Sequence, residues 1–197
     1  RSSRQAFSTC LRARAAKPGL APSVVRTRAY LQLDASARTF SSDLPLLILD
    51  SFGAPIGPSV LQPVYLMTFE PDPLTGRATL TSLPTLSMRA GLRYRGQSSS
   101  GFPKHQFKLE TWNEDDADED VALLGLPSES DWVLNGDYVD ESIIRNPLVY
   151  DFGREIGLEA PRSRFSEVFL HTSGDVLKGI LSDTPTTSYY GILSVME

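Results

Sequence analysis

Closely spaced turn residues between residues 29 and 94 constrain the fold of this chain more than any other feature. Glycine, proline and aspartate interrupt the stretch at Gly53, Pro55, Gly57, Pro58, Pro63, Pro71, Asp72, Pro73, Gly76, Pro84 and Gly91. Between these residues lie short strand-like runs at 46–49, 64–69, 78–82 and 92–95. Short strands at regular turn spacing favour an antiparallel β-rich unit.

Composition narrows the class of protein further. The chain has 197 residues, which fits one or two domains, and 41% of them are hydrophobic, which is enough for a core. The single cysteine, Cys10, excludes an intrachain disulfide and a cysteine-based zinc site, and two histidines are too few for a His-rich metal site. No apolar run approaches the ~20 residues that span a bilayer, so we expect no membrane span.

Charge is distributed unevenly along the chain. Residues 1–28 contain seven basic and no acidic residues, whereas the remainder carries 12 basic and 24 acidic residues. An acidic body of this kind is a poor partner for nucleic acid. The basic head predicts a disordered flank or linker, with a transit-like segment as the alternative. The acidic run 114–120 predicts a solvated loop, because it lacks the glycine that an EF-hand loop requires.

The segment 95–108, RGQSSSGFPKHQFK, combines a Gly/Ser turn with a basic strand. The turn offers backbone N–H groups and hydroxyls to an anion. After it the pattern alternates, so that Lys104 and Lys108 share one face of a strand and Phe107 and Leu109 the other. This arrangement can hold phosphates, but a hairpin with a solvated lysine face explains the same pattern. The turn matches neither a Walker loop nor a hydrolase elbow.

One amphipathic helix is predicted after residue 145. Ile144, Leu148, Phe152 and Ile156 recur at i+4 and form an apolar stripe. Asn146 and Pro147 suit the start of a helix and Gly157 suits its end. The alternative is a longer helix that begins near Asp140 and kinks at Pro147.

Several motifs in a fixed order resemble the CotH (spore-coat protein H) family of atypical protein kinases. The turn and strand supply Arg95, Gly96, Ser98, Ser99, Phe102, Pro103, Lys104 and Lys108. The runs LLGLP (123–127), SDWVL (130–134) and REIG (154–157) follow, together with Asp140, Ser142, Arg145, Asn146, Tyr190, Gly191 and Glu197. The resemblance covers residues 92–197. The chain departs from the family pattern at His105, at His171 and in an insertion-like loop, 172–188.

The resemblance implies an ATP-dependent kinase that transfers phosphate to Ser or Thr of a protein substrate, with magnesium. It implies that this chain is the small-lobe part, ending before the catalytic and metal-binding carboxylates, so no catalytic residue and no metal ligand is assigned here. The implied ATP-binding residues are Arg95, Ser98, Ser99, Lys104, Lys108 and Glu197. Glu155, with Glu141 behind it, is the implied acid that pairs with the lysine. By resemblance the source is bacterial and the location is the spore coat or outside the cytoplasm.

We therefore expect an α+β fold with three parts: a flank at 1–28, a β-rich region at 29–91 and a kinase-like small lobe at 92–197. The lobe is expected to be an antiparallel sheet with the helix 146–156 packed on it. Eight apolar side chains should be buried: Leu109, Leu134, Ile144, Leu148, Phe152, Ile156, Val168 and Leu170. Two other functions remain open, a non-catalytic β-rich binding module and a coat or surface assembly protein that has lost activity.

Overall fold

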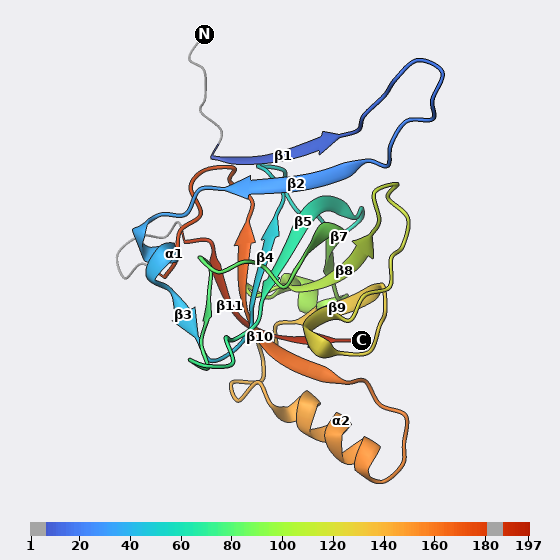
Figure 1. Ribbon diagram of the computed structural model, residues 1–197. Coiled ribbons are helices and arrows are strands. Elements are labelled where there is room, and N and C mark those ends of the chain that lie inside the picture. Colours follow the sequence, from blue (N-terminus) through green and yellow to red (C-terminus); the bar gives the residue numbers. More distant parts are fainter. Residues whose placement is uncertain (1–6, 181–186) are drawn as a thin grey trace.

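A closed barrel of seven strands forms the centre of the computed structural model, which describes residues 7–180 and 187–197 (Figure 1). Its strands, in chain order, are β4 (Leu46–Asp50), β5 (Gln62–Phe69), β7 (Leu86–Arg95), β8 (Gln106–Trp112), β9 (Asp131–Asn135), β10 (Ser163–His171) and β11 (Tyr189–Met196). Around the barrel the order is β10-β11-β9-β8-β7-β5-β4. Neighbouring strands are antiparallel except β10 and β4, whose parallel pairing closes the barrel.

Smaller elements surround the barrel. An antiparallel hairpin of β1 (Ser8–Ala13) and β2 (Arg26–Leu31) extends across one end (Figure 1), and β3 (Ser41–Ser42) pairs with β6 (Ala78–Thr79). The helices are α1 (Ala35–Thr39) and α2 (Arg145–Glu155), with short 3-10 turns η1 (Ser98–Gly101) and η2 (Leu123–Gly125). None of the helices in the described ranges is long and apolar enough to cross a membrane.

Alternation along the strands fills the barrel interior. In β8, Phe107 and Leu109 are fully buried while Lys108 between them stays partly exposed. Trp132 and Leu134 of β9 join them in the same core cluster. A second cluster lies between strands β4 and β5 and the α1 segment. Each large apolar side chain that is fully buried stabilises the fold by about 1.5–3 kcal/mol.

The expected fold class is wrong. Among the described residues the chain is mostly β, with a closed seven-stranded barrel and one helix longer than two turns, rather than a kinase-like lobe of sheet and packed helix. The reason is long-range pairing. Strand β10 joins β4 across about 120 residues, so strands from 29–91 and from 92–197 share one barrel. Local patterns carry no information about such a contact.

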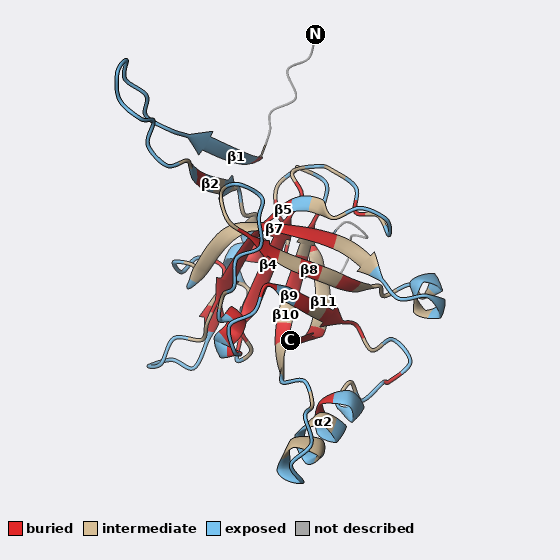
Figure 2. Cartoon of the chain, turned by 90° about the vertical axis from the view of Figure 1, so that its right-hand side faces the viewer, coloured by how far each residue is buried: buried red, intermediate tan, exposed pale blue. Residues whose placement is uncertain are grey.

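Helix α2 forms close to its predicted range but does not pack on the sheet. Figure 2 shows it as a largely exposed element that projects away from the barrel. The stripe residues Phe152 and Ile156 are 56% and 76% exposed, and Ile144 and Leu148 are about half exposed. Their predicted burial is wrong, because the closed barrel already covers its own core. The predictions for Leu109, Leu134 and Val168 are confirmed, and Leu170 is half-buried.

The predicted strands are present with small shifts in their ends. Runs 46–49, 64–69 and 92–95 lie inside β4, β5 and β7, whereas 78–82 is a strand only at Ala78–Thr79. The expected boundary between 91 and 92 falls inside β7. In the flank that we expected at 1–28, the described part begins with β1 and ends in β2. Part of the loop 172–188, residues 181–186, lies outside the described residues.

Candidate functional site

The Gly/Ser turn of the sequence becomes the connection between β7 and β8. Its 3-10 turn η1 begins at Ser98, two residues after Gly96. Gly96 has φ +105°, and a Cβ there would lie 2.0 Å from the Ser99 hydroxyl oxygen. Only glycine tolerates both conditions, so the turn depends on this residue. Arg95, the last residue of β7, is exposed beside it.

Lys104 follows the turn and runs back into the molecule. Its half-buried side chain passes Gly136 and Gly191, and its ammonium donates a hydrogen bond to the Ile192 carbonyl oxygen at 2.8 Å. A Cβ on Gly136 would lie 3.4 Å from Lys104 Cγ, and one on Gly191 would lie 3.6 Å from Nζ. The two glycines therefore form the passage that lets a lysine reach this position.

Burial changes the chemistry of Lys104. Loss of solvent lowers the pKa of its ammonium, and the nearby charge of Asp137 acts in the opposite direction. A cation held away from water interacts more strongly with an anion than a solvated one does. Lys104 is thus a partly desolvated cation, which can bind an anionic group more strongly than a fully solvated lysine can.

Aromatic rings brace the backbone beside Lys104. His105 stacks on Tyr94 with ring centroids 4.2 Å apart, and the Tyr190 hydroxyl donates to the His105 carbonyl oxygen at 3.1 Å. Burial is the main cause that raises the pKa of Tyr190 to about 12, so this hydroxyl stays protonated as a donor. These contacts join β7, β8 and β11 around the lysine.

Asp137 is the acid of this site. It follows β9, and its Oδ1 accepts hydrogen bonds from the side-chain amides of Asn135 (2.6 Å) and Asn146 (3.1 Å). Its Oδ2 is buried and has no hydrogen-bond donor. Burial is the main cause that raises the pKa of Asp137, and the charge of Asp140 raises it further. The side-chain amides that donate to Oδ1 and the charge of Lys104 act in the opposite direction.

The motif residues Asp140, Ser142 and Arg145 have a structural role at the start of α2. Asp140 Oδ1 accepts from the Ser142 hydroxyl at 2.6 Å, and Oδ2 accepts from the Arg145 backbone N–H at 3.0 Å. The Ser142 hydroxyl is the main cause that lowers the pKa of Asp140. This cap fixes the first turn of α2, and through it the position of Asn146 beside Asp137.

The other residues implied for ATP binding lie in separate places. Lys108 forms ion pairs with Glu110 (3.0 Å) and Asp131 (2.9 Å) on the outside of the barrel. Glu197 accepts from the backbone and side chain of Arg162. It lies five residues beyond Ile192, roughly 16 Å along the strand direction.

Glu155 is exposed near the end of α2, and no contact with Lys104 exists in the described chain. The structure therefore brings the turn close to Lys104 and leaves Lys108, Glu197 and Glu155 elsewhere. Sequence reasoning missed Asp137 and Asn135. Their position inside the segment 131–146 was the available signal, but no spacing rule connects them with Lys104.

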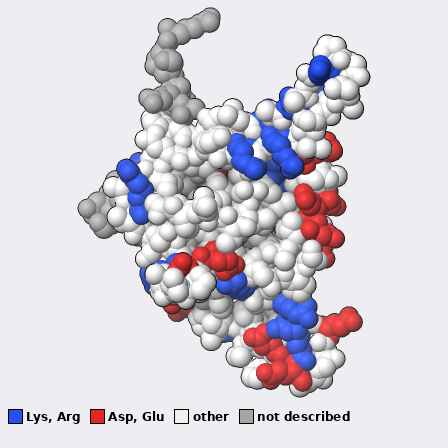
Figure 3. Space-filling model, in the orientation of Figure 1, with Lys and Arg blue, Asp and Glu red and all other residues white. Residues whose placement is uncertain are grey.

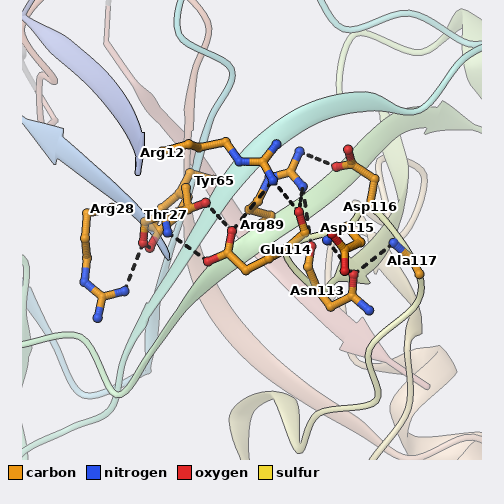
Figure 4. A network of polar contacts seen from close by, with 10 residues as sticks. All are labelled: Arg12, Thr27, Arg28, Tyr65, Arg89, Asn113, Glu114, Asp115, Asp116 and Ala117. Atoms are coloured by element: carbon orange, nitrogen blue, oxygen red, sulfur yellow. Dashed lines mark hydrogen bonds and ion pairs between the residues drawn. The ribbon is translucent and has the colours of Figure 1, made fainter. Parts of the chain in front are cut away.

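A separate cavity of about 710 Å³ lies under the β1–β2 hairpin. Basic side chains gather on this hairpin and acidic ones on the flank below it (Figure 3), and both line the cavity, including Arg14, Arg26, Asp115 and Glu119. Figure 4 shows the polar network that holds the hairpin against the barrel. At its centre the Glu114 carboxylate accepts from the Thr27 backbone at 2.8 Å and from the Thr27 hydroxyl.

Comparisons with known proteins agree with the motif order. A family model described as CotH kinase protein matches residues 92–197. The match begins within β7 and includes the turn, Lys104, Asp137 and the α2 cap. No curated protein matches the chain.

Proposed function

This chain belongs to the CotH kinase family, and we propose that it binds the phosphates of ATP at Lys104, as part of a kinase that phosphorylates Ser or Thr of a protein substrate. The observation that carries this proposal is the lysine itself. Its ammonium is partly withdrawn from water and lies beyond a Ser-rich turn, within the matched region.

The residues around Lys104 fit a polyphosphate. A lysine ammonium binds phosphate as a point charge, and turns rich in glycine and serine offer N–H and hydroxyl donors. Ser98 and Ser99 lie at the start of η1, and Arg95 directly precedes the turn without an ion pair in the described chain. We assign Lys104 and Arg95 to the phosphates, with Ser98 and Ser99 as hydroxyl donors.

Magnesium would accompany the nucleotide and neutralise part of the phosphate charge when bound. Within residues 7–180 and 187–197 there is no group of three His, Cys, Asp or Glu side chains that could hold a metal ion. These residues therefore do not fit a protein-bound metal site. We assign no metal ligand and derive no step through the ion.

Titration calorimetry of magnesium ATP against the chain tests the proposal. A charge-assisted contact to phosphate contributes about 1.5–3 kcal/mol, so Lys104→Ala should weaken binding about 10- to 150-fold. Arg95→Ala should also weaken binding. Lys108→Ala is the matched control, because this nearby lysine lies in β8 and is engaged in ion pairs with Glu110 and Asp131. If folded Lys104→Ala binds like the parent, the phosphate assignment is wrong.

A non-catalytic binding module is the second candidate function. The observation that favours it is the cavity of about 710 Å³, which lies under the hairpin and has no lining residue in common with the Lys104 site. Nuclear magnetic resonance (NMR) spectra with magnesium ATP and, separately, a Ser-rich peptide distinguish the two. Shifts around Trp112 with the peptide, and none around Lys104 with ATP, would favour the binding module.

A further inference from the structure

Asp137 occupies a position that needs a compensating charge. It has a left-handed backbone with φ 37°, a conformation that Asp and Asn tolerate better than most residues. Two amides hold its Oδ1, but Oδ2 is buried without a donor. A buried carboxylate oxygen that lacks a partner costs free energy unless a nearby cation offsets it.

Lys104 is a half-buried cation that has no counter-charge in its hydrogen bond. Its ammonium has three donors, and the Ile192 carbonyl accepts one of them. That carbonyl is neutral and supplies no counter-charge for the half-buried cation. Asp137 is the acid whose charge acts on Lys104, and Lys104 acts in return on Asp137. The two groups therefore stabilise each other's charged form.

The position of Asp137 is set by parts of the fold that meet only here. Asn135 is a buried residue at the end of β9, and Asn146 lies in the first turn of α2, which Asp140 caps. Amides from both elements converge on the same carboxylate oxygen. Asp137 is thus fixed from two sides, with its second oxygen left for a cation.

Helix α2 does not supply this acid. Glu155 is exposed near its far end, and Glu141 is exposed before its start. The other titratable groups beside the Lys104 backbone are His105 and the tyrosines that contact it, Tyr94 and Tyr190. Asp140, whose charge acts on Asp137, is engaged by Ser142 and Arg145. Asp137 follows Gly136, where a Cβ would lie 3.4 Å from Lys104 Cγ, so the carboxylate belongs to the segment that packs along the lysine side chain. Its buried Oδ2 has no hydrogen-bond donor, so Asp137 acts on the ammonium through its charge and not through a direct bond.

We propose that Asp137, rather than Glu155, is the acid that positions Lys104, with Asn135 and Asn146 holding Asp137 in place. Asp137 is a positioning residue, because it acts on the ligand through the lysine. The inference deepens the proposed function and rests on it for the identity of the ligand. The pairing of the two side chains can be measured without any ligand.

NMR titration of Lys104 Cε in the 197-residue chain tests the pairing directly. In Asp137→Asn the pKa of Lys104 should fall by about 0.5 unit, the effect of one unit charge a little beyond ion-pair distance under water-like screening. Asp137→Glu should restore it. Glu155→Gln, which removes the same charge from α2, should leave it unchanged. An unchanged Lys104 pKa in Asp137→Asn, or an equal fall in Glu155→Gln, would overturn the proposal.

The reciprocal measurement covers the case in which Asp137→Asn does not fold. In Lys104→Met the pKa of the Asp137 carboxyl should rise, because the cation that lowers it is gone. An Asp137 titration that is the same in the parent and in Lys104→Met would also overturn the pairing.

Magnesium ATP binding separates this inference from the proposed function. On going from pH 7.5 to 9.5, Asp137→Asn should lose more affinity than the parent, by at most about 3-fold, which is the ratio that corresponds to a pKa difference of about 0.5 unit. If Lys104→Met binds ATP like the parent while the lysine and aspartate titrations are coupled, the proposed function fails and the pairing stands. If ATP binding needs Lys104 but the titrations are independent, the pairing fails and the proposed function stands.

Discussion

The Glu114 carboxylate should hold the β1–β2 hairpin on the barrel, and its removal should release the hairpin. Thr27 is 3% exposed, and its backbone N–H and hydroxyl both donate to Glu114. The Arg12 guanidinium lies 3.9 Å from the same carboxylate. The Thr27 N–H of β2 donates to the Glu114 carboxylate and not to a neighbouring strand. The Glu114 side chain therefore accepts the hydrogen bond that a further strand would otherwise accept (Figure 4).

The size of the effect follows from these contacts. A hydrogen bond to a charged group contributes about 1.5–3 kcal/mol, and the exposed Arg12 pair adds little. The Glu114 side chain is 32% exposed, so screening reduces the two bonds together to about 2 kcal/mol. Glu114→Ala should therefore raise the population of the detached hairpin about 30-fold, at 1.4 kcal/mol per decade.

Hydrogen exchange followed by mass spectrometry measures this population. Amides of 26–31 should exchange about 30-fold faster in Glu114→Ala, while those of β8 and β9 keep their rates, because local opening is independent of the barrel. Asp115→Asn is the matched control, an exposed neighbour in the same loop. Equal exchange of β2 in the parent and in Glu114→Ala would refute the role of Glu114.

Three further predictions concern the pH dependence of Glu114, the turn at Gly96 and the exposed side chain of Phe152. Burial raises the pKa of Glu114, but the Thr27 hydrogen bonds outweigh it, so the pKa in the folded chain is lowered. The stabilisation of the hairpin by Glu114 should therefore be complete above about pH 5 and be lost as pH falls through the folded pKa. Hydrogen exchange of β2 at several pH values measures this loss. Gly96→Ala should distort the turn and weaken magnesium ATP binding, measured by calorimetry. The exposed apolar stripe of α2 should promote self-association at high concentration, since Phe152 is 56% exposed. Phe152→Ser should therefore lower the light scattering of the chain and leave its melting temperature unchanged.

The candidate site was predictable in part. The Gly/Ser turn and the alternation after it indicated Lys104 as a candidate residue, whose role in binding stays a prediction. The ordered motifs indicated the family that the comparison confirms. The predicted contacts of Lys108 and Glu197 with ATP could not be judged from the sequence, because they depend on which side chains pair with these residues in the fold. Lys108 alternates with the buried Phe107 and Leu109 as the pattern predicts, but Glu110 and Asp131 form ion pairs with it. Lys104 lies before β8, so the two lysines do not share a strand face. Pairing with another strand is invisible in a pattern read along one strand.

Local chemistry determined the short strands, the turn at Gly96 and the extent of α2, because φ preferences and side-chain alternation act over a few residues. The tertiary structure alone decided how these elements meet. The parallel pairing of β10 with β4 closes the barrel and joins the two regions, 29–91 and 92–197, that we expected from the sequence. Closure also buries the core without α2, which leaves the apolar stripe of that helix exposed. The same long-range folding places Gly136, and Asp137 after it, beside the Lys104 side chain, since side chains meet by distance in space and not by spacing along the chain.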